Sequence, residues 1–313
     1  MTMPATPAAF ADAVVLTGAT GSGKSAVALE LAEHLGGEIV GLDSMTLYRG
    51  LDIGTAKPTA ADRTRVPHHL IDVLDPWESG SVAWWLDRAA QACADIRRRG
   101  KVPMFVGGTP FYLKALLHGL FEAPPVDPAI RAKWEAEAER VGGAALHAKL
   151  AAVDPKAATK LHPNDMRRVV RALEVFDATG TRLSELQTSW ELPPAPIPCV
   201  VLDWPREELY RRIDARVLAM LDGGWLDEAR ALLGLPKPLS AEARQALGYR
   251  DLFDFLAYGG NWPDTVATIQ TRTRQFAKRQ LTWFRALPGA VWVPATGANL
   301  AGRVREAWAK DFG

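Results

Sequence analysis

GATGSGKS, residues Gly18 to Ser25, follows the apolar run Ala13–Leu16 and opens a helical pattern. It matches the phosphate-binding motif G-x4-G-K-[ST] in the strand-to-helix context that this motif requires. The glycines let backbone N–H groups converge on phosphate oxygens at a helix N-terminus, Lys24 adds a positive charge, and the Ser25 hydroxyl can contact magnesium. The stretch therefore predicts a polyphosphate site, without specifying ATP.

Three more apolar runs in the first 120 residues read as strands, each followed by a loop. They span residues 38–42, 69–73 and 103–106 and end at Asp43, near Asp75 and at Gly107-Gly108-Thr109. Alternation of short strands with helical patterns is typical of a parallel sheet in an α/β protein. Parallel strands gather such loops at one edge, where open α/β sheets bind ligands, so we expect one shared site.

The middle of the chain differs in character. After the proline-rich segment EAPPVDP, residues 128–187 are rich in Ala, Arg and Glu with helical periodicity, and ELPPAPIP precedes the strand-like CVVLDW. We therefore predict a P-loop NTPase-like α/β core formed by residues 1–120 and 196–313. Residues 121–195 are predicted to form an all-helical inserted subdomain.

The composition fits a globular protein of this length. Its 313 residues are 48% apolar and 23% charged, and 37 Lys and Arg balance 36 Asp and Glu. Two distant cysteines argue against a disulfide framework or a structural zinc site. The N-terminus lacks the charged region of a signal peptide, and no apolar run is long enough to span a membrane. We expect a soluble cytoplasmic protein.

The signals of an ordinary P-loop NTPase are incomplete. The strand at 103–106 ends in Gly-Gly-Thr rather than in an acidic residue, and the chain contains no NKxD motif. Asp43 follows a strand at the expected phosphate edge, where it could be a magnesium ligand, a general base, or only a helix cap. His68 and His69 are adjacent and point to opposite sides of a strand, so we expect a structural role for them rather than a shared metal.

Positive charge is concentrated in two segments. In the insertion, Arg167, Arg168 and Arg171 lie opposite the apolar face of a predicted helix that follows His162–Asp165. Residues 265–305 contain no Asp or Glu but seven Lys and Arg. A helix there would carry Ile269, Phe276, Trp283 and Leu287 on its core side and Arg274, Lys278 and Arg285 on the other, with Arg272 and Arg279 flanking. Two basic faces in a neutral protein suggest a folded RNA partner.

These segments together resemble the bacterial tRNA dimethylallyltransferases, also called tRNA isopentenyltransferases, of the IPP transferase family. The similarity runs in order through GATGSGKS, GLDSMTLYRGLDIGTAKP, PHHLIDVLDP, VGGTPFYLKALLHGL, HPNDMRRVVRALEV, ALGYR and TRTRQFAKRQLTWFR. It implies transfer of the dimethylallyl group from dimethylallyl diphosphate to N6 of the adenosine immediately 3′ of the anticodon, with release of diphosphate. It also implies the anticodon stem-loop of tRNA as partner, Mg²⁺ as cofactor, and a short, monomeric form without a zinc-finger extension.

The resemblance also assigns residues. Asp43 would be the general base, Thr109 would hold the reacting end, and Lys24 and Arg250 would stabilise the leaving group. The loop residues that would bind the diphosphate are Gly18, Ala19, Thr20, Gly21, Ser22, Gly23, Lys24 and Ser25, with Ser25 as the magnesium contact. The residues that would face tRNA are Asp43, Ser44, Met45, Thr46, Thr109, Arg131, Arg167, Arg168, Arg171, Gln245, Gly248, Tyr249, Arg250, Arg274, Gln275, Lys278, Arg279 and Gln280.

Three other functions are compatible with parts of the sequence. A P-loop small-molecule kinase would have the phosphate loop but no use for the basic helix, and a non-catalytic RNA-binding module would leave Asp43 and Thr109 idle. An adenylate isopentenyltransferase acting on free AMP would not need the insertion. The residues that line the dimethylallyl pocket are not predicted.

Overall fold

A computed structural model describes residues 6–120, 127–187 and 194–312, with the side chains of residues 311 and 312 excepted. The chain divides into two compact units, residues 1–117 with 194–313 and residues 118–193. Sequence reasoning placed these boundaries near 121 and 195. Residues 122–126 of the first proline-rich segment and residues 191–193 of the second lie outside the described residues.

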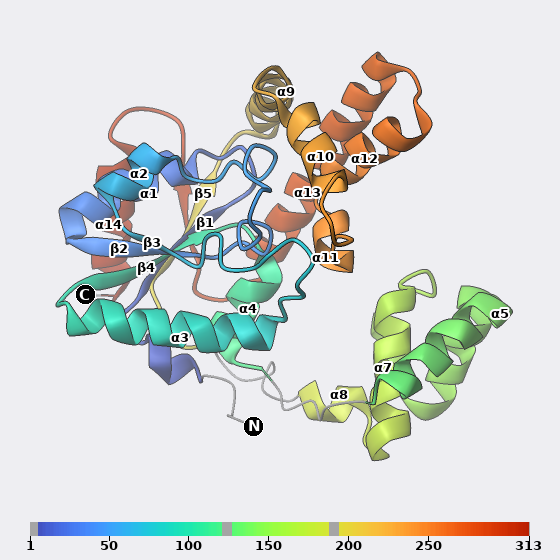
Figure 1. The fold of residues 1–313 in the computed structure, drawn as a ribbon. Helices are drawn as coiled ribbons and strands as arrows, with labels where there is room; N and C mark the ends of the chain where they lie inside the picture. Colours follow the sequence, from blue (N-terminus) through green and yellow to red (C-terminus); the bar gives the residue numbers. More distant parts are fainter. Residues whose placement is uncertain (1–5, 121–126, 188–193, 313) are drawn as a thin grey trace. The chain divides into compact units, whose positions relative to one another are not determined.

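The larger unit is built on a six-stranded parallel sheet in the order β3-β2-β4-β1-β5-β6 (Figure 1). This is the α/β core that the sequence predicts. Its strands are β1 (Val14–Gly18), β2 (Gly37–Gly41), β3 (His68–His69), β4 (Val102–Gly107), β5 (Cys199–Asp203) and β6 (Val291–Pro294).

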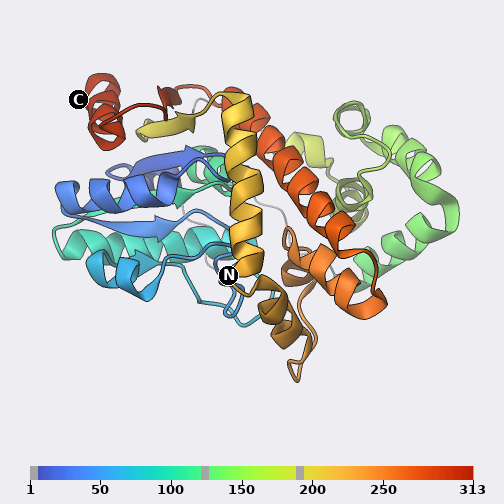
Figure 2. The same ribbon diagram turned by 90° about the horizontal axis from the view of Figure 1, so that it is seen from above.

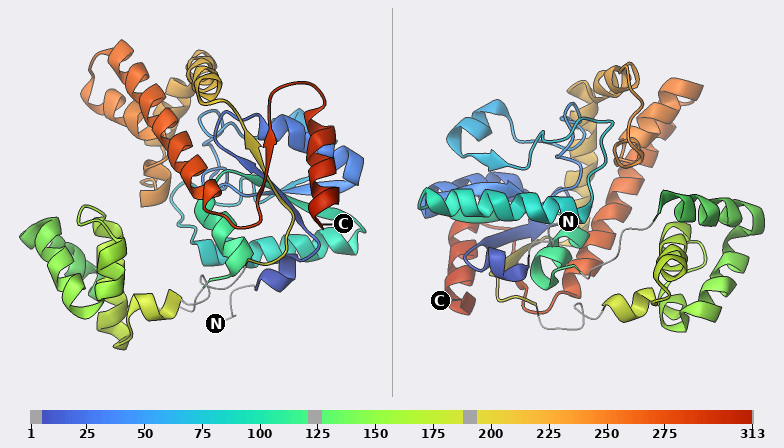
Figure 3. Two further views of the ribbon diagram at one scale, coloured as in Figure 1. Left: turned by 180° about the vertical axis from the view of Figure 1, so that it is seen from behind. Right: turned by 60° about the horizontal axis from the view of Figure 1, so that its bottom comes forward.

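Helices cover both faces of this sheet. Helix α1 (Lys24–Leu35) and α14 (Leu300–Phe312) pack against each other, and α14 also contacts β5 and β6 (Figure 3, left). On the other face, α3 (Val82–Arg98) packs on β2 and β4. The remaining helices before the insertion are η1 (Pro7–Phe10), α2 (Ala60–Arg65) and α4 (Pro110–His118). Both faces are therefore buried, as a parallel sheet requires.

A group of helices lies beyond the carboxyl ends of the strands. Figure 2 shows α9 and α13 side by side there, and α13 also contacts β1 and α12. The bounds are α9 (Arg206–Asp222), α10 (Trp225–Leu233), α11 (Ala241–Arg244), α12 (Tyr249–Tyr258) and α13 (Trp262–Arg285). These helices place side chains from the second half of the chain over the edge where the strand-end loops gather.

The smaller unit is helical throughout its described part. It contains α5 (Pro128–Val153), α6 (Pro155–Lys160), α7 (Met166–Thr179) and α8 (Leu183–Leu186). Helix α5 is kinked at Gly142, and its buried Leu146 and Leu150 share a core with the apolar face of α7. Asp165 caps α7 by accepting a hydrogen bond from the Arg168 N–H, where the sequence places the start of this helix.

The strand predicted at residues 69–73 is wrong beyond its first residue. Leu70 and Asp72 have positive φ angles of 59° and 57°, which end β3 after His69. The backbone N–H groups of Asp72 and Val73 instead bind the carbonyls of Thr46 and Leu47. The side chain of Lys57, buried except for 2% of its surface, binds Asp72 and holds this turn. A long-range ion pair thus overrides a local strand pattern.

Gly107 provides a test of the packing at the sheet edge. A Cβ atom there would lie 2.0 Å from the Leu42 carbonyl oxygen, and this backbone cannot move away without breaking the β2–β4 pairing. We expect Gly107→Ala to destabilise the protein by about 1–3 kcal/mol or more, as overpacking does. Gly234→Ala is the control, because its Cβ would make only ordinary contacts of 3.5 Å or longer. Equal melting temperatures of the two variants would contradict the predicted clash.

Candidate active site

The phosphate loop connects β1 to α1 in a conformation that only glycine adopts easily. Gly21 and Gly23 have φ angles of 81° and 83°, and Gly23 is the residue that caps the N-terminus of α1. A Cβ atom on Gly18 would lie 2.9 Å from the Ser22 hydroxyl oxygen. The loop therefore keeps the tight path that turns backbone N–H groups toward an anion at a helix N-terminus.

Residues from beyond β5 hold the loop by its carbonyl groups. The indole N–H of Trp204 donates to the Ser22 carbonyl at 2.9 Å, and the Arg212 Nε donates to the Gly21 carbonyl at 3.0 Å. The Arg212 guanidinium lies 4.2 Å from the centre of the Trp204 ring, so the two side chains support each other. These contacts hold the loop through its carbonyl groups and leave its backbone N–H groups available for phosphate.

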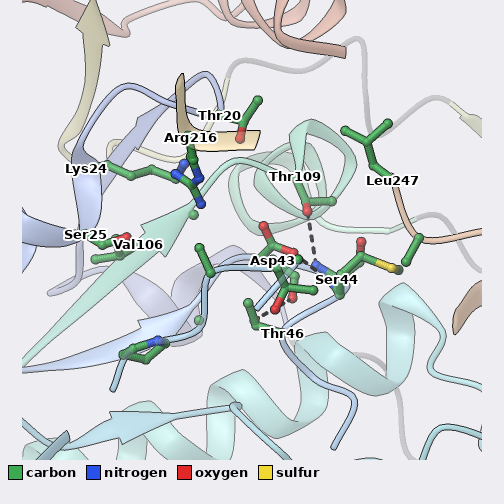
Figure 4. A pocket seen from close by; sticks show the side chains of 18 of the residues that line it. Thr20, Lys24, Ser25, Asp43, Ser44, Thr46, Val106, Thr109, Arg216 and Leu247 are labelled. Atoms are coloured by element: carbon green, nitrogen blue, oxygen red, sulfur yellow. Dashed lines mark hydrogen bonds between the residues drawn. The ribbon is translucent and has the colours of Figure 1, made fainter. Parts of the chain in front are cut away.

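Asp43 follows β2 after one residue, Leu42, in a turn that is tied to the end of β4 (Figure 4). One carboxylate oxygen of Asp43 accepts the N–H of Met45 at 2.9 Å. The Ser44 N–H donates to the Thr109 hydroxyl at 3.1 Å, and the Thr109 N–H donates to the Leu42 carbonyl at 3.2 Å. These bonds fix the Asp43 carboxylate, and its second oxygen has no hydrogen-bond partner among the described residues.

Arg216 is the site residue that sequence reasoning missed. It extends from the middle of α9 toward the end of Lys24 and toward Asp43 (Figure 4). Burial and, secondarily, the charge of Arg216 lower the pKa of Lys24 to about 8, while Asp43 acts in the opposite direction. Burial also lowers the pKa of Arg216, and Asp43 opposes this shift. Two cations thus face a single carboxylate.

These groups line one cavity of about 340 Å³ within the larger unit. Four loop residues reach it, Thr20, Gly23, Lys24 and Ser25, together with Asp43–Thr46, Thr109 and Arg216. The remaining wall is largely apolar, and its larger side chains are Ile39, Ile71, Val106, Ile213, Val217, Met220, Trp225, Leu247 and Phe276. The cavity combines an anion-binding end with apolar surface, which suits an amphiphilic ligand.

The segment at residues 52–58 forms another part of the wall and is clamped from α10. The Glu228 carboxylate accepts the backbone N–H groups of Asp52, Ile53 and Gly54 at 3.0, 2.9 and 3.5 Å, and it also accepts the Tyr249 hydroxyl. The Trp225 ring packs so closely on Gly54 that a Cβ atom there would lie 2.1 Å from the indole nitrogen. The wall is therefore fixed by side chains rather than by a strand.

The two histidines have separate structural contacts. His68 Nδ1 lies 2.7 Å from the Val66 carbonyl, whereas His69 Nε2 lies 2.6 Å from the buried Glu38 carboxylate. Within the described residues no group of three His, Cys, Asp or Glu side chains could hold a metal ion. Cys93 and Cys199 are buried and free.

Two corrections apply to α13, where sequence reasoning expected unpaired cations above an apolar stripe. Arg272 pairs with Asp251 and Arg274 pairs with Asp214, so both arginines are already neutralised within the protein. The buried face follows Ile269, Thr273, Ala277, Gln280, Leu281 and Phe284, so Ile269 is buried as predicted, whereas Phe276, Trp283 and Leu287 are only partly buried. Lys278 and Arg279 remain exposed, as does Gln275.

The segment 245–250, which was predicted to contact tRNA, also contains both exposed and buried residues. Gln245 and Arg250 are exposed, but Gly248 is buried and Tyr249 is completely buried, with its hydroxyl bound to Glu228. Tyr249 thus has no surface for RNA. Arg250 lies at the start of α12 near Asp254 and does not line the cavity, whereas Arg216 does.

In the smaller unit, a buried carboxylate organises two of the predicted arginines. Glu174 is 1% exposed, accepts a hydrogen bond from Arg171 at 2.5 Å and lies 3.6 Å from the Arg131 guanidinium. Arg168 pairs with Asp165 at 3.3 Å, and Arg167 is exposed on the same helix. The three arginines lie on α7 as expected, but Arg168 and Arg171 are not unpaired, because acidic residues of the same unit neutralise them.

None of the helices in the described part of the chain combines the length and the apolarity that crossing a bilayer requires.

The fold and the site define a P-loop α/β protein in which the phosphate loop shares its cavity with a strand-end aspartate. The chain belongs to the IPP transferase family, because the model of that family matches residues 46–287. A model described as isopentenyl transferase matches residues 11–70.

Curated relatives and solved structures are similar over nearly the whole chain. The tRNA dimethylallyltransferase of Geobacter metallireducens is 47% identical over 91% of this chain and 93% of its own length. The enzyme of the same name from Anaeromyxobacter dehalogenans is 47% identical over 94% of this chain and 99% of its own.

The crystal structure of the full-length tRNA isopentenylpyrophosphate transferase of Bacillus halodurans is 38% identical, covers 95% of this chain and 94% of its own, and has a TM-score of 0.68. A eukaryotic dimethylallyltransferase, described as acting on tRNA, is 30% identical, covers 96% of this chain and 76% of its own, and has a TM-score of 0.73.

The lowered pKa of Lys24 predicts a pH dependence of anion binding. The ammonium is charged below its pKa of about 8 and loses its proton as the pH rises through that value. The affinity for inorganic pyrophosphate with magnesium should therefore fall above pH 8, by up to about tenfold per pH unit. Isothermal titration calorimetry of the wild type and of Lys24→Arg checks this. Because the arginine stays charged, the variant shows how the ionisation of pyrophosphate alone changes the Kd, and the ratio of the two Kd values removes that effect. A Kd ratio of the two proteins that does not change between pH 7 and 9.5 would contradict it.

Proposed function

We propose that this protein is a tRNA dimethylallyltransferase, which transfers the dimethylallyl group of dimethylallyl diphosphate to N6 of the adenosine immediately 3′ of the anticodon. The observation that carries the proposal is the presence of Asp43 in the cavity of the phosphate loop, while β4 ends in Gly-Gly-Thr without an acidic residue. The loop would bind a leaving diphosphate, and the carboxylate would serve the incoming nucleophile. The family membership and the names of the relatives support this assignment.

The cationic end of the cavity would stabilise the leaving group. Lys24 and Arg216 approach each other there, beside the N–H groups of the loop. As the bond between the allylic carbon and its oxygen breaks, negative charge accumulates on the diphosphate, and prearranged donors lower the energy of that transition state. We assign this role to Lys24 and Arg216, with Arg250 left outside the cavity.

The nucleophile is weak, because the lone pair of the adenine amine is delocalised into the ring. Asp43 would accept the amine proton through its second carboxylate oxygen as the new bond between N6 and the allylic carbon forms. The bond between that carbon and oxygen breaks, and diphosphate leaves with the electron pair. Thr109 would hold the Asp43 turn through its bond to the Ser44 N–H. The adenine must leave its stack to enter the cavity.

The apolar wall of the cavity would bind the dimethylallyl group. Val217 and Met220 follow Arg216 along the same face of α9, and Trp225 closes that end of the cavity beside Gly54. A five-carbon branched chain would exchange water for these side chains, which favours binding in proportion to the apolar area covered. We propose that these three residues contact the dimethylallyl group.

The cavity contains hydroxyl and carboxylate oxygens, which are ligands that magnesium prefers. The Ser25 hydroxyl and the Asp43 carboxylate both line it, and Mg²⁺ binds through a few such oxygens together with phosphate oxygens and water. Bound with the diphosphate, the ion would neutralise part of the charge of the leaving group. We propose Ser25 as its protein contact.

For tRNA we propose the exposed cations of each unit as contacts. They are Lys278 and Arg279 on α13, with the exposed Gln275, and Arg167 and Arg168 in the smaller unit; we add Arg131 and Arg171, which are half-buried around Glu174. Phosphate contacts of this kind supply much of the affinity for RNA and depend on salt. The smaller unit would thus be the tRNA-contacting insertion that the sequence predicts.

Asp43→Ala tests the base directly. We expect it to lower the rate of prenyl transfer to saturating unmodified tRNA by about 100-fold or more, because a positioned base contributes that much. The Kd for tRNA should change by less than about twofold, and Asp75→Ala should be as active as the wild type, because Asp75 pairs with Arg49 at the surface. Steady-state kinetics with filter binding measures both quantities. Equal losses in rate and affinity would exclude the base assignment.

The double variant Lys278→Ala/Arg279→Ala tests the RNA face. We expect weaker tRNA binding and a slope of log K against log salt that is less steep by between about one and two. Arg274→Ala should change the slope less, because Asp214 already neutralises that arginine. Filter binding at several salt concentrations gives the slopes, and an unchanged slope in the double variant would refute the contact.

A further inference from the structure

One buried side chain spans the gap between the phosphate loop and the loop after β4. Gln280 lies on the inner face of α13 and is 2% exposed. Its side-chain oxygen accepts the Thr20 N–H at 2.9 Å, and its side-chain nitrogen donates to the Gly108 carbonyl at 2.6 Å. One partner is a donor and the other an acceptor, so the amide has only one orientation that satisfies both.

The two partners belong to the two halves of the proposed reaction. Thr20 is in the loop assigned to the diphosphate. Gly108 precedes Thr109, whose hydroxyl accepts the Ser44 N–H next to Asp43. Hydrogen bonds therefore connect the phosphate loop through Gln280 to Gly108, and the adjacent residue Thr109 connects to the turn that carries the proposed base.

The packing around Gly108 shows how closely this amide is fitted. A Cβ atom on Gly108 would lie 2.6 Å from the Gln280 side-chain nitrogen and 3.6 Å from the Lys24 Nζ. Only glycine lets the β4 loop approach the amide and the lysine at once. The burial of Gln280 leaves almost no surface for a nucleotide, in contrast to Lys278 and Arg279 on the same helix.

We propose that Gln280 is a positioning residue for prenyl transfer, and that it sets the separation between the phosphate loop and the Thr109–Asp43 turn. This inference rests on the proposed function and replaces the sequence-based expectation that Gln280 contacts tRNA. Gln280 lines the cavity, but its side-chain oxygen and nitrogen are bound to Thr20 and Gly108, so we infer that it acts through these two partners. Because α13 also carries the exposed cations, the helix that would bind RNA also holds both halves of the site in register.

The test uses two variants of the full-length protein. Gln280→Met keeps the volume but loses both hydrogen bonds, and Gln280→Asn keeps the amide but is too short to reach both partners. Displacement of reacting groups by about 1 Å costs on the order of 100-fold in rate, so we expect kcat to fall by about 10- to 100-fold in both variants. The Kd for tRNA should stay within twofold, and the Kd for magnesium pyrophosphate without tRNA should rise.

The control is Gln270→Met, which makes the same substitution on the same helix. Gln270 binds the Asp214 carbonyl and does not line the cavity, so kcat and both Kd values should match those of the wild type. Circular dichroism melts establish whether each variant is folded. If Gln280→Met does not fold, the comparison is made with Gln280→Asn alone.

The outcomes separate this inference from the proposed function. A wild-type protein that binds pyrophosphate but prenylates no tRNA would refute the function, and the pyrophosphate measurements would still test Gln280. An active wild type with Gln280 variants whose kcat and pyrophosphate affinity are unchanged would overturn the positioning role. Weaker tRNA binding at an unchanged kcat would overturn it as well and would make Gln280 an RNA contact.

Discussion

The parallel pairing of β1 and β2 with the central strand β4 is the constraint on which the site depends. It brings the ends of three strands to one edge of the sheet, so that the phosphate loop, Asp43 and Thr109 lie around one cavity although they are distant in sequence. Gly107 lies so close to the Leu42 carbonyl that no side chain fits at position 107. The helices after β5 then cover this edge and complete the cavity.

The electrostatics of the cavity agree with a strongly anionic ligand. Burial and, secondarily, the charge of Arg216 lower the pKa of Lys24, and the Asp43 carboxylate opposes the shifts of both cations. A bound diphosphate would neutralise both cations and remove their mutual repulsion. The same geometry leaves the carboxylate beside the apolar wall, where it can serve a neutral nucleophile.

Local sequence signals were sufficient for most strands of the sheet, with residues 69–73 as the exception. They were also sufficient for the phosphate loop and Asp43, because each directly follows an apolar run. The family resemblance supplied the role of Thr109 and the tRNA-facing segments 43–46 and 245–250, whereas the basic residues of α7 and α13 followed from the charge pattern. Arg216 has no such signal, since it lies in the middle of a helix and becomes a site residue only through the packing of α9. The partners of Arg272 and Arg274 lie 21 and 60 residues away in the chain, so their neutralisation was not predictable from the acid-free run. Tyr249 and Gln280 were placed in RNA-facing segments by resemblance, and only the fold reveals that both are buried.

The most direct test of the account is nucleoside mass spectrometry of unmodified tRNA after incubation with the protein, magnesium and dimethylallyl diphosphate, beside a reaction that contains ATP instead. The account predicts that one C5H8 unit is added to the adenosine 3′ of the anticodon with the allylic donor only. Consumption of ATP without any adduct, in the presence of tRNA that a known prenyltransferase can modify, would contradict it and would favour a P-loop kinase in which Asp43 binds the metal.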